Sequence, residues 1–246
     1  MKIKNLTGLS LVGHDVSIRS EGNMGLNVQM SEQETIENRQ HLAIKNHLNL
    51  DHFVAMQQIH STYIHSVRES DLGRGSRLWS TAIPSCDGLV TDQKGPVLMA
   101  FGADCPLIIA ADEERGVIGI AHSGWKGTIK GIAKELIFKM TKDFDGDVRH
   151  INVGITASAR ECCYEVDHDL AERFRAEGYS DSVHCRDSSS YINLHDTIRS
   201  QLLGEGVCDD KINSMTDCTI CGNQFFSFRK EKEQSGRFCG LIWLKQ

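Results

Sequence analysis

One stretch of the sequence constrains the fold most, because two short apolar runs flank a polar turn. The first run spans residues 105–111 and the second 117–122; both are rich in aliphatic residues and too short for free-standing helices. The charged connection between them ends in Gly116, which suits a surface turn. We therefore predict two adjacent buried strands joined as a hairpin. Such a hairpin would bring Cys105, at the start of the first strand, beside His122, at the end of the second.

A helical pattern follows His122 after a loop that contains glycine. Apolar residues recur from Ile129 to Met140 at the spacing of one buried helix face. The start of this helix would offer free N–H groups and a favourable dipole to an anion. A thiol, an imidazole and an anion pocket would then meet in one place. The alternative interpretation is that Cys105 is a small core residue and His122 a hydrogen-bonded structural one.

The bulk composition is that of a globular protein with a sizeable core. The 246 residues would suffice for one large domain or two small ones, and no linker divides them. The net charge of −6, without a basic run, argues against nucleic acid and anionic membranes as partners. We find no apolar stretch of membrane-spanning length and expect no signal peptide. The nine cysteines, an odd number in a core-rich chain, favour a reducing compartment, so we expect a cytoplasmic protein.

Further elements are predicted along the chain. Helices are expected after the N-cap residues Ser31, Asp167 and Asn193. Arg39 lies on the first of these helices, where composition alone favours a solvated surface charge. Strands are expected at residues 10–18 as an edge strand, and at 53–59, 86–91, 97–101, 151–155 and 238–244.

A C-x-x-C motif, Cys218 to Cys221, is weak evidence for a metal. One such motif supplies at most two ligands, and no second pair stands at zinc-ribbon spacing. We therefore interpret these two cysteines as structural thiols, with a redox pair as the alternative.

Short motifs also follow one another in a specific order over nearly the whole chain. They are Ser17-Ile18-Arg19 with Leu26-Asn27, Asn38-Arg39, Gln58-Ile59-His60-Ser61, Asp87-Gly88-Leu89-Val90-Thr91, Ala103-Asp104-Cys105-Pro106, Ala121-His122-Ser123-Gly124-Trp125, Cys162-Cys163-Tyr164-Glu165-Val166, Cys218-Thr219, and Phe226-Ser227-Phe228-Arg229 with Gly236-Arg237. In this order they resemble the laccase-domain family, whose members are also described as multicopper polyphenol oxidoreductases and as purine nucleoside phosphorylases.

The resemblance implies a fold and a metal site. The implied fold is a single α/β (α+β) domain over residues 1–246, a four-layer α/β/β/α sandwich similar to a deamidating bacterial toxin and cysteine hydrolase. The implied metal ligands are His60, Cys105 and His122, of which the residue patterns alone indicate the last two. The chain departs from the family at Lys126, where an arginine is usual, and a lysine loses the bidentate fork.

One cysteine and two histidines form the ligand set of a catalytic zinc, which keeps a fourth position open. Copper tolerates the same ligands, but a multicopper oxidase needs more histidines than the sequence assigns, so we favour Zn²⁺ over Cu²⁺. The resemblance implies phosphorolysis of adenosine, inosine, guanosine and methylthioadenosine, and deamination of adenosine. The expected partners are therefore a purine nucleoside and inorganic phosphate.

Several residues are candidates for roles in that chemistry. Asp104 and Glu165 are candidate proton shuttles. Arg39, Lys126 and Arg229 are candidate phosphate ligands. The aromatic side chains that could stack on a purine base are Trp125, Phe226 and Phe228.

Other functions stay open at this point. The chain could be a copper-dependent phenol oxidase. It could be a cysteine hydrolase with Cys105 as nucleophile and His122 as base. It could also be a metal-binding partner protein without activity, and the resemblance further raises a role in proofreading cell-wall precursors.

Overall fold

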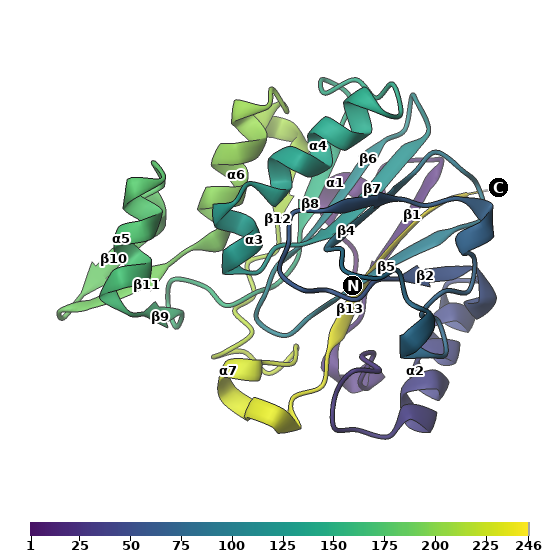
Figure 1. Cartoon of the computed structure of the whole chain (residues 1–246), viewed down its shortest axis with the longest axis horizontal. Helices are drawn as coiled ribbons and strands as arrows, with labels where there is room; N and C mark the ends of the chain where they lie inside the picture. Colours follow the sequence, from purple (N-terminus) through teal and green to yellow (C-terminus); the bar gives the residue numbers. More distant parts are fainter. Residues whose placement is uncertain (246) are drawn as a thin grey trace.

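The computed structural model describes residues 1–245, which form a mixed α/β structure with three β-sheets, the class that the sequence predicts (Figure 1). The strands are β1 (Val12–Val16), β2 (Phe53–Ala55), β3 (Ile64–Ser66), β4 (Gly88–Thr91), β5 (Val97–Gly102), β6 (Leu107–Asp112), β7 (Val117–His122), β8 (Asn152–Ile155), β9 (Glu165–Val166), β10 (Val183–Arg186), β11 (Ser189–Ile192), β12 (Ile212–Ser214) and β13 (Phe238–Leu244). The helices are α1 (Lys4–Thr7), α2 (Glu32–Lys45), α3 (Trp125–Ile129), α4 (Ile132–Lys142), α5 (His168–Ala176), α6 (Leu194–Gly204) and α7 (Phe228–Glu231).

Two of the sheets share a core. The four-stranded sheet has the order β1-β13-β5-β2, and the six-stranded sheet has the order β12-β8-β6-β7-β4-β3. Buried residues of both sheets meet in one hydrophobic cluster, with Leu98 and Ile242 from the first sheet and Leu107 and Ile120 from the second. The predicted edge strand is β1, at the border of the four-stranded sheet, whereas the C-terminal strand β13 lies between β1 and β5.

Helices cover the outer faces of these two sheets. Ile132 of α4 and Ile198 of α6 pack with Val153 of the six-stranded sheet, and Leu42 of α2 packs with Met99 of the four-stranded sheet. In Figure 1, α4 and α6 accordingly lie above the strands and α2 lies below them. No helix in the described part of the chain is long and apolar enough to cross a membrane.

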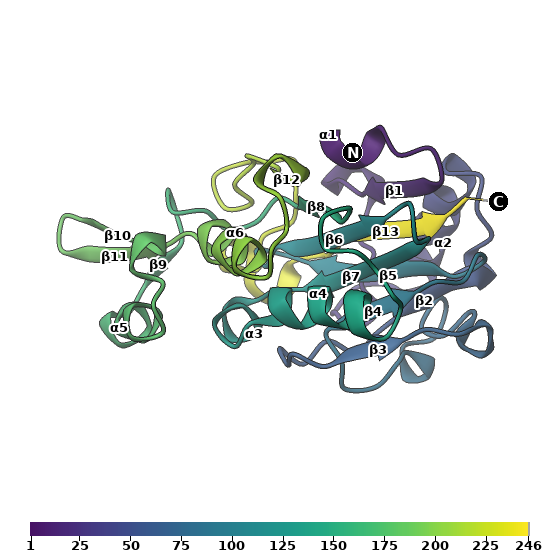
Figure 2. The ribbon, with the colours of Figure 1, turned by 90° about the horizontal axis from the view of Figure 1, so that it is seen from above.

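Residues 165–192 form an arm, which consists of the third sheet, β10-β11-β9, and helix α5. Figure 2 shows this arm projecting from the rest of the molecule. Its base packs through Phe174 and Ile192 against Ile129 and Leu194. The N-cap Asp167 accepts a hydrogen bond from the backbone N–H of Leu170 at 2.8 Å and so begins α5 as expected.

Three expectations need correction. The helix predicted from Ile129 is divided into α3 and α4, because Gly131 between them adopts a left-handed conformation with φ 88°. The strand predicted at 53–59 ends at Ala55, because Gln58 pairs with the backbone of Phe101 and Asp87 holds the N–H of His60. Arg39 is not a solvated surface charge, since its side chain extends from α2 into the protein interior and is completely buried.

Candidate metal centre and pocket

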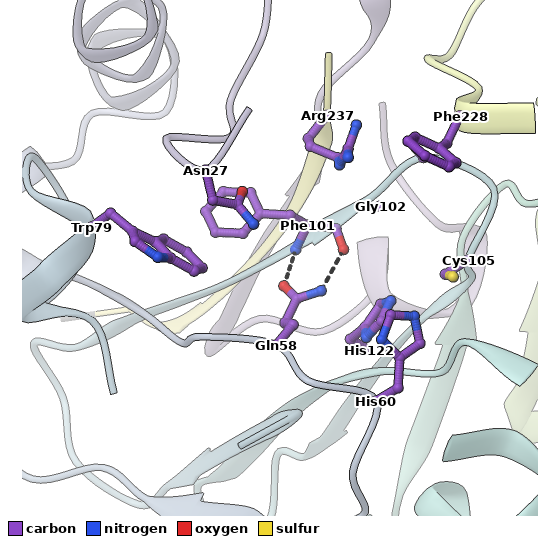
Figure 3. A pocket seen from close by; sticks show the side chains of 11 residues that line it. Asn27, Gln58, His60, Trp79, Phe101, Gly102, Cys105, His122, Phe228 and Arg237 are labelled. Carbon is purple, nitrogen blue, oxygen red and sulfur yellow. Dashed lines mark hydrogen bonds between the residues drawn. The ribbon is translucent and has the colours of Figure 1, made fainter. Parts of the chain in front are cut away.

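The β6–β7 hairpin brings the predicted cysteine and histidine together. The two strands are antiparallel, with Leu107 opposite His122, and Cys105 lies just before β6. His60 joins them from the loop between β2 and β3. The ligand atoms of the three side chains all lie within 4.8 Å of one another. The rings of His60 and His122 are nearly perpendicular, with centroids 4.8 Å apart (Figure 3).

Asp87, just before β4, fixes the loop that carries His60. Its carboxylate accepts hydrogen bonds from three successive backbone N–H groups: Ile59 at 3.1 Å, His60 at 3.0 Å and Ser61 at 2.6 Å. His60 has φ 62°, a left-handed conformation that costs a non-glycine residue roughly 1–2 kcal/mol. The carboxylate offsets this cost and holds the ring over the site.

The same carboxylate orients His122. Its Oδ1 lies 2.9 Å from Nδ1 of His122, and both side chains are buried. Because an ionised carboxylate only accepts hydrogen bonds, Nδ1 carries the hydrogen, and the opposite nitrogen, Nε2, is the atom left to bind a metal. A histidine whose second nitrogen donates to a carboxylate is a common arrangement in metal sites.

The charged forms of Cys105 and His122 favour each other. Burial opposes the thiolate, but His122 and His60 outweigh it and lower the pKa of Cys105 to about 6. Burial likewise opposes the imidazolium, but Cys105 and Asp87 raise the pKa of His122 to about 9. At neutral pH the sulfur is therefore a thiolate, the form that binds metals and attacks electrophiles.

Gly124, directly after β7, leaves room for these side chains. A Cβ at this position would lie 2.6 Å from Cδ2 of His60 and 3.0 Å from Sγ of Cys105. Any side chain would therefore displace one of two candidate ligands. The glycine of the A-H-S-G-W motif is needed for close approach of the backbone.

The three residues fit a zinc ion. Zinc–ligand bonds of about 2.0–2.3 Å in a tetrahedron place ligand atoms roughly 3.3–3.8 Å apart, which small side-chain shifts would reach here. The donor set contains two imidazole nitrogens and one thiolate, all ligands that zinc accepts. With three protein ligands, the fourth position would be open.

A pocket of about 320 Å³ adjoins this centre. Figure 3 shows His60, His122 and Cys105 on one side of it, with Trp79, Phe101 and Phe228 around the rest. Gln58 holds this wall: its amide donates to the carbonyl of Phe101 and accepts from its N–H, each at 2.8 Å. The remaining residues that line the pocket are Asn27, Gly102, Ala103 and Arg237.

Arg237 supplies the pocket's cationic side chain, and the sequence analysis assigned it no role. Its Nη1 donates to the carbonyls of Ser235 at 2.8 Å and Gly236 at 3.0 Å, and its guanidinium lies 5.5 Å from the ring centroid of Phe228. Within residues 1–245, neither Nε nor Nη2 of this arginine has a hydrogen-bond partner. The motif Gly236-Arg237 was the signal that could have identified it.

Asp104 precedes Cys105 but does not line the pocket. Its carboxylate accepts hydrogen bonds from the Thr219 hydroxyl and from the backbone N–H of Arg229, each at 2.6 Å. With φ 88°, it is the second non-glycine residue of the centre in a left-handed conformation. Its contacts indicate that it positions the loop that carries Cys105.

Glu165, Arg229 and Trp125 line a second groove, at the base of the arm. A side-chain oxygen of Glu165 accepts from the Ser189 hydroxyl at 2.7 Å, and Nη1 of Arg229 donates to the carbonyl of Glu165 at 3.0 Å. Of the three aromatic side chains considered for stacking, only Phe228 lines the pocket beside the metal centre. Phe226 is buried in the core between the sheets.

The two remaining candidate phosphate ligands lie elsewhere. Arg39 donates to the carbonyls of Met24, Gly75 and Ser76, and its guanidinium lies 4.9 Å from the ring centroid of Phe101, behind the pocket wall. Lys126 is exposed on α3, with Nζ 5.5 Å from the ring centroid of Trp125. Because α3 has only five residues, its dipole is smaller than that of the single long helix that was expected.

Comparison with known proteins places this site in a family. The model of the family described as "Multi-copper polyphenol oxidoreductase laccase" matches residues 11–245. The chain belongs to this family. It is 33% identical over 225 residues, covering 89% of this chain and 82% of the relative, to a protein of Geobacillus stearothermophilus named purine nucleoside phosphorylase YlmD. It is 28% identical over 206 residues, covering 81% of this chain and 78% of the relative, to a protein of an unknown prokaryotic organism named adenosine deaminase RL5.

A solved structure shows the same fold. The crystal structure of the Bacillus licheniformis hypothetical protein YfiH superposes with a TM-score of 0.90 at 28% identity, covering 95% of this chain and 93% of that chain. The three-sheet arrangement is therefore a YfiH-like fold.

Proposed function

We propose that this protein is a zinc-dependent purine nucleoside enzyme that catalyses phosphorolysis of adenosine, inosine, guanosine and methylthioadenosine, and deamination of adenosine. One observation carries the proposal: the three-ligand centre opens onto a pocket with aromatic walls and a single arginine. The names of the relatives, purine nucleoside phosphorylase and adenosine deaminase, support the same substrate class.

His60, Cys105 and His122 would hold the ion. A zinc ion held there would supply a Lewis acid with an open coordination position. The chain's own residues provide the rest of the site. Asp87 keeps Nε2 of His122 directed at the centre and fixes the His60 loop, so the ligands are preorganised.

The aromatic side chains would bind the purine base. Trp79, Phe101 and Phe228 give the pocket flat apolar surfaces, on which any base can stack. Gln58 keeps one of these surfaces in place through its two hydrogen bonds to the backbone of Phe101. The ribose would then lie between the base and the polar end of the pocket.

Arg237 is the phosphate ligand that the pocket offers. Its Nε and Nη2 are free to form a bidentate contact with phosphate oxygens beside the ribose. Arg229, which lines the second groove, and Lys126, which lies beside Trp125 of that groove, stay candidates for a phosphate that approaches from this side. The donors of Arg39 already have carbonyl partners inside the fold, so we give it a structural role.

The proton-transfer assignments change in the same way. Both carboxylate oxygens of Asp104 already accept hydrogen bonds, so we propose it as a positioning residue for the Cys105 loop. Glu165 stays a candidate shuttle only for a substrate that reaches the second groove.

We also propose that the chain folds as one four-layer unit. The order of α2, the four-stranded sheet, the six-stranded sheet and the pair α4 and α6 supports an α/β/β/α sandwich. The metal centre lies at the rim of the six-stranded sheet, where the hairpin places it.

The candidate ligands suit a single zinc ion better than the several copper ions of a laccase. In residues 1–245, the groups of three or more potential metal ligands are this centre and a cluster of four cysteines, and neither contains more than two histidines. A multicopper oxidase houses several copper ions and needs more imidazoles than these.

A cysteine hydrolase is the second candidate, and the geometry favours it specifically. Cys105, His122 and Asp87 form a nucleophile, base and orienting carboxylate in series. The thiolate state of Cys105 at neutral pH would suit this chemistry. Such an enzyme would keep its activity in the presence of chelators, and iodoacetamide would alkylate Cys105 and abolish the activity.

The proposed function is tested by incubating the purified protein with a panel of purine nucleosides and inorganic phosphate. We expect ribose 1-phosphate and free base from at least one nucleoside, and inosine from adenosine. His60→Ala should abolish both activities and the zinc of this centre, because it removes one of three ligands. The matched control is His41→Ala, which changes an exposed histidine on α2 and should leave both unchanged.

Two results would count against the proposal. One is the absence of product from every purine nucleoside with zinc-loaded protein. The other is full activity of the His60→Ala variant. Activity that survives chelation and is lost on alkylation of Cys105 would instead support the cysteine hydrolase.

A further inference from the structure

Four cysteines from two distant motifs meet at the base of the arm. Their sulfur atoms all lie within 4.8 Å of one another. The sequence interpretation treated the C-x-x-C motif as isolated, because its partners are two adjacent cysteines and not a second C-x-x-C. This four-cysteine cluster consists of Cys162, Cys163, Cys218 and Cys221.

The sheet topology forces the two motifs together. β8 and β12 are parallel neighbours, and the loops that carry the cysteines follow directly after these strands. The loops stay paired beyond the sheet, because Ser158 and Cys218 form a parallel β-bridge. The N–H of Thr219 donates to the carbonyl of Ser158 at 2.9 Å. The pairing of the loops therefore aligns the two cysteine pairs.

The turn of the C-x-x-C motif is shaped to present its sulfurs. The N–H of Gly222 donates to the carbonyl of Cys218 at 2.9 Å, and a Cβ on Gly222 would lie 2.5 Å from that oxygen, so the tight turn requires glycine.

We propose that the four-cysteine cluster binds a structural zinc ion, separate from the His60 centre. Four thiolates close the tetrahedral coordination of zinc, which is the pattern of a structural and not a catalytic site. A tetrahedron with zinc–sulfur bonds of about 2.3 Å has sulfur–sulfur edges of roughly 3.8 Å. The sulfurs of Cys162 and Cys221 lie 3.8 Å apart, which is this edge length.

The arrangement fits an ion better than a disulfide. All nine cysteines are free thiols, and a disulfide needs its sulfurs about 2.05 Å apart. A tetrathiolate zinc site carries two negative charges. Arg186 lies beside the cluster, where its Nη2 donates to the carbonyls of Cys162 at 3.0 Å and Glu161 at 2.8 Å.

The ion would join three parts of the molecule. It would hold the chain that leads into the arm, at Cys163, against the loop after β12. That loop reaches the catalytic side through the Thr219 hydroxyl, which donates to Asp104. The N–H of Ala159 donates to the carbonyl of the same aspartate at 2.8 Å. The proposed ion would thus fix the residue that directly precedes Cys105.

The test is the zinc content of full-length protein purified in a thiol reductant without chelator. We expect about two zinc ions per chain, one at each site. In the His60→Ala background, which removes the first site, about one zinc should remain. Adding Cys162→Ser and Cys221→Ser to this background should remove it. The matched control, Cys185→Ser with Cys208→Ser, changes two exposed cysteines outside the cluster and should retain it.

X-ray absorption at the zinc edge identifies the ligands of the remaining ion. The His60→Ala protein should show a first shell of four sulfurs and no nitrogen, and its cobalt-substituted form should show an intense sulfur-to-cobalt charge-transfer band. The proposal is overturned if His60→Ala protein holds no zinc, if its zinc has nitrogen ligands, or if mass spectrometry finds a disulfide within the cluster. Because these readouts use metal content and not activity, they stand whether or not the protein acts on nucleosides.

Discussion

Asp87 accepts hydrogen bonds from three successive backbone N–H groups and from the ring of His122, although it would not touch the metal itself. A single carboxylate thus sets the position of one ligand and the tautomer of another. The sequence analysis placed this aspartate in a family motif but gave it no role. Its function depends on the loop after β2 folding back over β4, and no local pattern encodes that contact.

Asp87→Asn should weaken zinc binding at the His60 centre by about 10–100-fold, the usual effect of removing a carboxylate that supports a ligating histidine. The amide has only one accepting oxygen, so its NH2 group must face either the ring of His122 or the N–H groups of Ile59 and Ser61, and one set of contacts is lost. Competition with a chromophoric chelator measures the affinity. Asp92→Asn, which alters an exposed ion pair with Arg68, is the control. An unchanged affinity in Asp87→Asn would contradict this role.

Gly124→Ala should empty the same centre without unfolding the protein. The added methyl group would overlap the His60 ring and press on the sulfur of Cys105, so one ligand must move. Metal analysis and circular dichroism check this outcome together. Gly204→Ala adds a methyl group at the end of α6, where it would meet no side chain or other part of the fold within 4 Å, and should retain the metal. A Gly124→Ala protein with a full zinc complement would show that the close approach is not required.

At the scale of elements, the sequence predicted the β6–β7 hairpin correctly because its signal is local. Two aliphatic runs of strand length and a glycine-ended turn leave few other structures, and the juxtaposition of Cys105 and His122 follows from them. The loop that carries His60 had no such signal. Residues after Ala55 read as a continued strand, but long-range contacts of Gln58 with Phe101 and of Asp87 with the loop override that tendency.

Arg39 shows the same limit within α2. Its position on a polar helix favoured an exposed charge, yet loops distant in sequence supply three carbonyl acceptors that bury it. Composition records the helix but not the loops that pack over it. The burial of Arg39 can be predicted only when it is known that residues 24 and 75–76 pack against the helix.

Replacing Arg39 with Met should destabilise the protein by about 3 kcal/mol, because the carbonyls of Met24, Gly75 and Ser76 lose their donors inside the fold. Arg39→Lys should restore little of this, since an ammonium cannot reach the same acceptors. Urea unfolding measures both. Arg77→Met, at an exposed ion pair with Asp51, should change stability by less than about 0.5 kcal/mol. A loss that small for Arg39→Met would refute the structural role.

At the scale of the whole molecule, the sequence predicted the mixed α/β class and most strands, but not how the strands form sheets. β13 enters the four-stranded sheet between β1 and β5, and β8 and β12 become parallel neighbours. Each pairing joins segments far apart in the chain, for which local patterns carry no information. For the same reason the sequence revealed two pairs of cysteines but not that they form one cluster.

Asp15 joins β1, α2 and the start of the chain, and this junction should make stability depend on acid. Burial opposes the charged carboxylate, but Lys45, the α-amino group of Met1 and Asn46 outweigh it and lower its pKa to about 2. A lowered pKa stabilises the fold above the unfolded value of about 3.9, and this contribution is lost as pH falls from about 4 toward 2. The full contribution is about 2 kcal/mol.

Urea unfolding of wild-type protein and of Asp15→Asn at about pH 5 and about pH 3 isolates this effect. The variant should be less stable at the higher pH, and the difference between the two proteins should shrink at the lower pH. A difference that stays constant between the two conditions would show that the ionisation of Asp15 does not contribute.

The most direct test of the central claim compares nucleoside phosphorolysis by the same protein before and after metal removal. A chelator should strip the ion held by His60, Cys105 and His122 and abolish release of ribose 1-phosphate. Zinc added in excess of both proposed sites should restore the release, while copper should not confer oxygen consumption with phenols. Undiminished phosphorolysis in protein shown to hold no metal would contradict the claim that a three-ligand zinc centre performs the chemistry.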